Sequence, residues 1–179
     1  AKTAIARRDL FAKTRAINLL SFARVFLFAS RDVWFVVGVP VFLYEKLGWS
    51  FDQVGAFMAA WVVGYGIVQV AAPRFSGRGG GASGATVAAR WWGVVLALLP
   101  AMIVWGLAQQ GLPGTAVLIA GLFVFGAVFA VNSSLHSYLI VAFSDHDKVA
   151  LNVGFYYMAN AIGRFAGTLL SGLVYQLAG

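Results

Sequence analysis

Four charged side chains lie within stretches that are otherwise apolar enough to cross a membrane. They are three arginines, Arg24, Arg31 and Arg164, and one aspartate, Asp32. An ion in the middle of a membrane helix costs roughly 2.5–3.5 kcal/mol on insertion scales, so such residues tend to have a functional role. The excess of positive charge would attract an anion, and guanidinium groups present paired N–H donors that match phosphate-like oxyanions.

The spacing of these residues predicts how a helix presents them. Arg24 and Arg31 are seven residues apart, which places them within roughly 20° of each other and about 10 Å apart along the axis. Arg31 and Asp32 are sequence neighbours about 100° apart, so we expect that they do not simply neutralise each other. Asp32 is interpreted either as the charge partner of Arg31 or Arg164, or as a proton-coupling group.

Uncharged polar residues recur at helical spacing in the same stretches. In the last stretch a polar residue occurs at every fourth position, and Gly163, Gly167 and Ser171 lie beside that stripe, which allows close helix contact. Such polar side chains often only bridge helices, so a structural role competes with a functional one. The uncharged candidates for substrate binding are Asn132, His136, Tyr156 and Asn160.

Five apolar stretches are long enough to hold these residues inside a bilayer, which a helix crosses in about 20 residues. Glycine and alanine occur throughout and no strand-like alternation is present, so we expect an all-α integral membrane bundle of about five transmembrane helices. The first, fourth and fifth stretches exceed the minimum length and should tilt, bend or project beyond the hydrocarbon. The predicted spans are Ile17–Leu43, Val54–Ala72, Trp91–Ala108, Thr115–Phe143 and Val149–Leu177.

The composition agrees with a membrane protein. Of the 179 residues, 61% are hydrophobic and 11% are charged, and the mean hydropathy is +0.84. A soluble domain carries about 25% charged residues. The chain has no cysteine, which excludes disulfides and cysteine–metal sites. We expect no enzyme activity, metal or cofactor, because the sequence shows no nucleophile–base signature and no metal-ligand spacing.

The net charge of +7 is explained by membrane topology rather than by nucleic-acid binding. The opposite side of the membrane has only Lys46, so the positive-inside rule places the N-terminus and the glycine-rich segment Pro73–Arg90 in the cytoplasm. That segment is interpreted as a flexible loop, and residues 1–16 as a cytoplasmic segment before the helical region 17–179. The basic residues on the predicted cytoplasmic side are Lys2, Arg7, Arg8, Lys13, Arg15, Arg74, Arg78, Arg90 and Lys148.

Several strings within the apolar stretches are distinctive. They include RDVWFVV from Arg31, WVVGYGIVQ from Trp61, FAVNSSLHSYLIV from Phe129 and NVGFYYMANA from Asn152. Together they resemble the C-terminal half of the ArsJ organoarsenical permease family, a branch of the major facilitator superfamily. The resemblance covers nearly the whole chain.

The resemblance implies a twelve-helix transporter in which residues 17–179 are equivalent to the seventh to eleventh helices. We therefore expect an N-terminal half and a last helix that are absent from this chain, and a multi-pass location in the bacterial inner membrane. The implied function is export of 1-arseno-3-phosphoglycerate from the cytoplasm by alternating access, which confers arsenate resistance. Glyceraldehyde-3-phosphate dehydrogenase makes this ester when arsenate replaces phosphate, so a functional link to that enzyme is implied.

These expectations assign a role to each candidate. Arg31 and Arg164 would pair with substrate oxyanions, Arg24 would attract the substrate at the inner mouth, and the uncharged candidates would orient it. Asp32 would set the rotamer of Arg31 or carry a proton. The alternatives are a major facilitator carrier for another organic anion or drug, and a non-transporting membrane scaffold.

Overall fold

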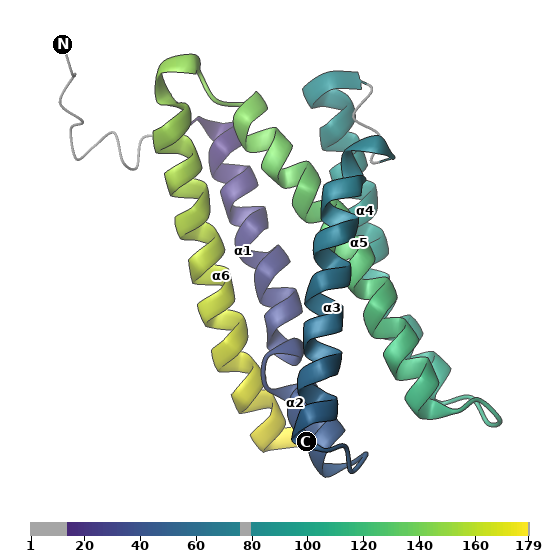
Figure 1. Ribbon diagram of the computed structural model, residues 1–179. Helices are drawn as coiled ribbons and strands as arrows, with labels where there is room; N and C mark the ends of the chain where they lie inside the picture. The colour runs from purple at the N-terminus through teal and green to yellow at the C-terminus, as the bar shows by residue number, and fades with distance from the viewer. Residues whose placement is uncertain (1–13, 76–79, 179) are drawn as a thin grey trace. The chain divides into compact units, whose positions relative to one another are not determined.

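The computed structural model describes residues 14–75 and 80–178, and these residues form α-helices joined by short turns (Figure 1). This confirms the all-α prediction for the described ranges. The α-helices are α1 (Arg15–Phe35), α2 (Gly38–Glu45), α3 (Phe51–Ala71), α4 (Gly81–Leu107), α5 (Gly114–Ala142) and α6 (Val149–Ala178). The predictions for Lys2, Arg7, Arg8, Lys13 and Arg78 fall outside the described residues.

Within the described ranges, four helical segments are long and apolar enough to cross a membrane. They are Arg15–Glu45, Phe51–Arg74, Gly81–Leu107 and Gly114–Ala142. Each contains one of the first four predicted spans almost entirely, and together they mark the chain as a multi-pass membrane protein. Helix α6 has 30 residues, which is ample length. It is not among the four segments because Asn152, Asn160 and Arg164 interrupt its apolar sequence.

Helix α4 begins ten residues earlier than the predicted span, at Gly81 instead of Trp91. The interpretation of residues 73–90 as a flexible loop is therefore wrong for residues 81–90. Four of these residues are alanine, the best helix former, and their propensity extends the helix beyond the strongly hydrophobic part. Gly81 itself has a φ of 64°, a backbone conformation that glycine adopts without steric cost.

The helix of the first span is interrupted between α1 and α2, which corresponds to the bend among the outcomes that its length allowed. Pro40 lies in the first turn of α2, and its ring would clash with the carbonyl of Val36 in a continuous helix. The break leaves the N–H of Val37 without its helical acceptor, and that N–H donates instead to Ser171 Oγ at 3.2 Å. A side chain on α6 thus satisfies a backbone group that hydrocarbon could not.

The described helices form two compact units. The first unit contains α1, α6 and the last seven residues of α5, 136–142. The second unit contains α2, α3, α4 and the preceding part of α5, residues 114–135.

In the first unit, α1 and α6 lie side by side and run in the same direction (Figure 1). A Cβ atom at Gly163 would clash with the carbonyl of Val25, and one at Gly167 would lie 2.9 Å from the carbonyl oxygen of Ala29. A step of four residues along α6 corresponds to a step of four residues in the same direction along α1, as parallel packing requires. The predicted close contact through small residues is therefore confirmed.

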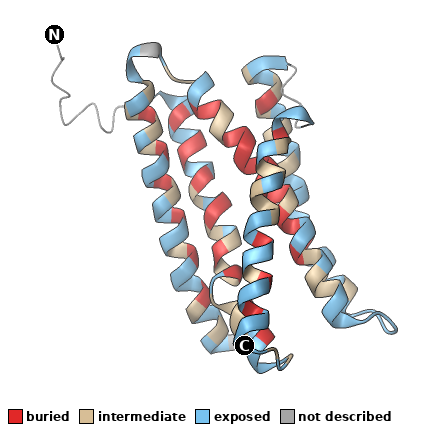
Figure 2. Ribbon diagram, in the orientation of Figure 1, coloured by how far each residue is buried: buried red, intermediate tan, exposed pale blue. Residues whose placement is uncertain are grey.

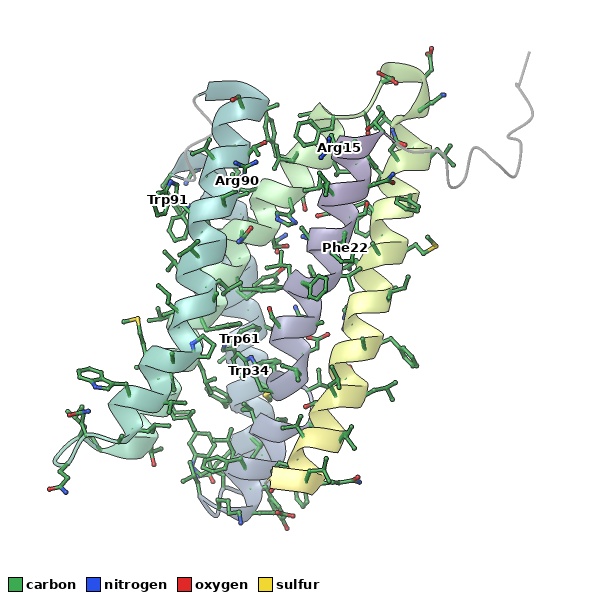
Figure 3. The ribbon with its side chains drawn as sticks, turned by 180° about the vertical axis from the view of Figure 1, so that it is seen from behind. Arg15, Phe22, Trp34, Trp61, Arg90 and Trp91 are labelled. Carbon is green, nitrogen blue, oxygen red and sulfur yellow. The ribbon has the colours of Figure 1, made fainter. Side chains whose placement is uncertain are left out.

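In the second unit, Trp61 joins α3 to α5 (Figure 3). Its indole N–H donates to the carbonyl of Leu122 at 2.8 Å, and its ring lies against Gly126, where a Cβ atom would be 2.8 Å away. Tyr65 stacks on Trp61 with ring centroids 5.9 Å apart, and Phe129 packs against Tyr65. This aromatic cluster forms the core of the unit.

Much of the surface of α4 and α6 is exposed although its side chains are apolar (Figure 2). Trp91 and Trp105 project from α4, each about two-thirds exposed, and 14 residues separate them, or about 21 Å of helix. Phe165 and Leu169 are similarly exposed on α6.

Gly167→Ala should destabilise the α1–α6 pair by about 1–3 kcal/mol, because overpacking forces two backbones apart. Gly172→Ala is the matched control, since no atom lies within 4 Å of its added Cβ. Thermal melting of the purified protein in detergent measures the difference. Equal melting temperatures for the two variants would contradict the close contact between α1 and α6 at Gly167.

Candidate functional site

Arg24 is held in the first unit by two aromatic rings. Its side chain comes from α1 and is 4% exposed. The guanidinium carbon lies 4.1 Å from the ring centroid of Phe28, one turn further along α1, and 4.7 Å from that of Tyr156 on α6. Cation–π contacts of this kind are attractive and become stronger when water is excluded. The rings therefore fix the position of a buried cation.

Asp32 lies two turns further along α1 and contacts two arginines. The Nε–H of Arg31 donates to its Oδ1 at 2.5 Å, and Nε of Arg164 on α6 lies 3.4 Å from its Oδ2. The Asp32 side chain is 1% exposed, whereas those of Arg31 and Arg164 are 12% and 60% exposed. Asp32 is thus the shared counterion of two arginines from different helices.

The expectation that Arg31 and Asp32 do not neutralise each other is wrong. The two Cα positions do differ by about 100° around the helix, but the arginine side chain is long enough to reach back to its neighbour. The contact with Arg164 agrees with the interpretation of Asp32 as a charge partner across helices. The proton-coupling alternative stays a prediction.

Phe28 separates the two parts of this charged region. The centroid of its ring lies 4.1 Å from the guanidinium carbon of Arg24, which precedes it on α1, and 4.9 Å from that of Arg31, which follows it. One apolar ring thus contacts both cations. Phe22 and Trp34 mark the two ends of this stretch of α1 in Figure 3.

Several buried polar atoms of the first unit have no hydrogen-bond partner among the described residues. Among them are Ser21 Oγ, His136 Nδ1 and Asn160 Oδ1. Ser21 precedes Arg24 by three residues and therefore shares its helix face. Asn160 follows Tyr156 by one turn of α6, and His136 lies on the part of α5 that belongs to the same unit. The structure thus brings six of the seven substrate-binding candidates, and Asp32, into one unit.

Asn132 is the remaining candidate and belongs to the second unit. It is buried, and its side-chain amide donates to the carbonyl of Ala89 on α4 at 3.4 Å. This contact bridges two helices, which is the structural role that competed with substrate binding for the uncharged candidates.

Sequence reasoning missed the aromatic contacts around Arg24. The spacing of four residues between Arg24 and Phe28 is a signal that could have shown the first of them. No sequence signal pairs Arg24 with Tyr156, because the contact depends on α6 lying against α1.

Chemically, this region suits the binding of an anion. Three guanidinium groups and one carboxylate leave an excess of positive charge, which is the balance that oxyanions require. Within the described residues, no three side chains of the metal-binding types His, Cys, Asp and Glu lie close enough together to hold a metal ion.

Comparison with known proteins does not assign the family. No protein-family model, no curated protein and no solved structure matches this chain. The resemblance to the ArsJ family therefore stays a prediction, and the geometry of the first unit is the basis for a functional proposal.

Asp32→Asn should destabilise the protein strongly, by about 3–5 kcal/mol, because it leaves the largely buried Arg31 without its countercharge. The double variant Arg31→Gln with Asp32→Asn should recover much of that loss, since it removes both charges. Thermal melting of the single and double variants measures the coupling. Additive effects of the two substitutions would show that the pair is not coupled.

Proposed function

We propose that this chain forms part of a membrane carrier for an organic anion. The observation that carries the proposal is the buried cation Arg24, held by aromatic rings in a unit where Ser21 Oγ, His136 Nδ1 and Asn160 Oδ1 have no hydrogen-bond partner among the residues that the structure describes. A buried cation is expensive in hydrocarbon, so it is retained where it serves binding or transport. The nature of the anion, an arsenic-containing phosphoglycerate ester, rests on the resemblance to the ArsJ family.

The proposal includes α6 as a fifth crossing. Helix α6 packs along α1 in the same direction, and α1 lies within the 31-residue apolar segment Arg15–Glu45. A helix that follows a spanning helix through Val25, Ala29 and Val37 must itself extend across the hydrocarbon. The polar residues Tyr156 and Arg164 of α6 then contact α1 instead of facing lipid.

Two other functions compete with this proposal. A scaffold would need no buried ionic groups, because buried ion pairs are weak contributors to stability compared with apolar packing. A carrier for a different organic anion or drug would use the same cationic site. Only the cargo separates it from an organoarsenical exporter, so the decisive experiment identifies the cargo.

Everted vesicles that contain the protein test the cargo. We expect labelled arsenate to enter only while glyceraldehyde-3-phosphate dehydrogenase turns over with its substrates. Entry without the dehydrogenase would show that inorganic arsenate or another anion is carried. No entry in either case, from correctly inserted protein, would favour the scaffold.

Arg24→Gln should lower this uptake at least about tenfold, the order expected for loss of a charge-assisted contact. Arg15→Gln is the matched control, because Arg15 is exposed at the first turn of the same helix. Wild-type uptake by an Arg24→Gln protein that inserts normally would contradict the role of Arg24.

The predicted orientation has its own test, because the chain contains no cysteine. A single cysteine at the exposed residue Asp145 should react with a membrane-impermeant maleimide only in everted vesicles. One at the exposed residue Gln110 should react only in intact cells or spheroplasts. The reverse pattern would invert the topology predicted from the positive residues.

A further inference from the structure

The unit that contains Arg24 also contains buried hydrogen-bonding atoms without a partner among the described residues. Ser21 and His136 are each more than nine-tenths buried, yet Ser21 Oγ and His136 Nδ1 have no partner among the described residues. Leaving such an atom unsatisfied costs about 1–3 kcal/mol. Most buried polar atoms in proteins are paired with protein or water, so a cluster of exceptions indicates that a ligand supplies the missing partners.

These atoms come from three helices of one unit, which also contains the buried cation Arg24. Ser21 is on α1, His136 is on the last two turns of α5, and Asn160 is on α6. Ser21 shares the helix face of Arg24, and Asn160 follows by one turn the residue Tyr156, whose ring contacts the Arg24 guanidinium. Ser21 and Asn160 therefore lie on the two helix faces that meet at Arg24, and His136 belongs to the same unit.

The chemical types of these groups define the ligand. Guanidinium is a donor only, and it binds two oxygens of an oxyanion at once. Asn160 Oδ1 is an acceptor only, so it needs a donor that an ionised oxyanion lacks but a hydroxyl group provides. A serine hydroxyl can donate to an oxyanion or accept from a hydroxyl. An anion that carries hydroxyl groups satisfies the whole set.

Arg31 and Arg164 are placed differently. Both already contact the carboxylate of Asp32, which occupies the position that a substrate oxyanion would take. Because Asp32 and Arg164 come from α1 and α6, this contact joins the two helices. It acts as an ionic latch between them.

We propose, on the basis of the proposed function, that Ser21, Arg24, His136 and Asn160 form the binding site for an oxyanion that also carries a hydroxyl group. Arg31, Asp32 and Arg164 form a latch and do not bind the anion. Arg24 supplies the charge, and the two aromatic rings hold its guanidinium in place before the ligand arrives.

Ser21→Ala tests the site against a merely structural role. The buried hydroxyl has no protein partner, so its removal should leave the melting temperature of the ligand-free protein unchanged or raised. The dissociation constant of 3-phosphoglycerate, the probe, should rise about three- to tenfold with the lost hydrogen bond. Isothermal titration of the purified protein in nanodiscs measures it.

Ser171→Ala is the matched control, because Ser171 is an equally buried serine of the same unit whose hydroxyl accepts the N–H of Val37. It should lower the melting temperature and leave the affinity for 3-phosphoglycerate unchanged. The proposal is overturned if Ser21→Ala binds the probe as tightly as wild type, or if it behaves like Ser171→Ala.

Asn160→Leu tests the requirement for a hydroxyl group. Wild type should bind 3-phosphoglycerate more tightly than the analogue without the 2-hydroxyl, and this preference should shrink in the variant. An undiminished preference would remove Asn160 from the site. Failure of the wild-type protein to bind either probe would count against both the site and the proposed function, whereas normal binding by Ser21→Ala and Asn160→Leu would count against the site alone.

Discussion

The contact between the backbones of α1 and α6 is the constraint on which the charged region depends. Gly163 and Gly167 have no side chains, so the backbone of α6 can touch that of α1 at Val25 and Ala29. Helix axes this close bring side chains of both helices into a narrow shared zone. Tyr156 can then reach the guanidinium of Arg24, and Arg164 can approach Asp32.

Burial then decides how the ionic groups arrange themselves. A bilayer offers no water to an isolated charge, so each ion must find a partner within the protein. Asp32 obtains two arginines, and Arg24 obtains two aromatic rings. In the first arrangement a protein carboxylate already lies between the two guanidinium groups, whereas in the second the guanidinium lies against rings that carry no net charge. The first cluster therefore already contains an oxyanion and the aromatic contacts of the second do not, which is why the two clusters receive different roles.

The sequence predicted the features that depend on neighbouring residues, such as the apolar helices, the bend of the first span and the small-residue run Gly163–Ser171. Prediction from the sequence failed for contacts that depend on the length of a side chain or on a helix far away in the sequence. The angle between Arg31 and Asp32 was estimated correctly, but a flexible arginine overcomes such an angle. The contact of Arg24 with Tyr156 joins residues far apart in the sequence, so it required knowledge of which helices pack together.

The bend at Val36 and Val37 has a mechanical consequence. Bending an intact helix breaks several backbone hydrogen bonds, but here the helical ladder is already interrupted, and the boundary between the two compact units falls at the same place. A change of direction at this joint gives up the bond from Val37 to Ser171, which is worth about 0.5–1.5 kcal/mol, and leaves the helical hydrogen bonds of α1 and α2 intact. The first span is therefore weakest in bending at this joint, while α1 stays packed against α6.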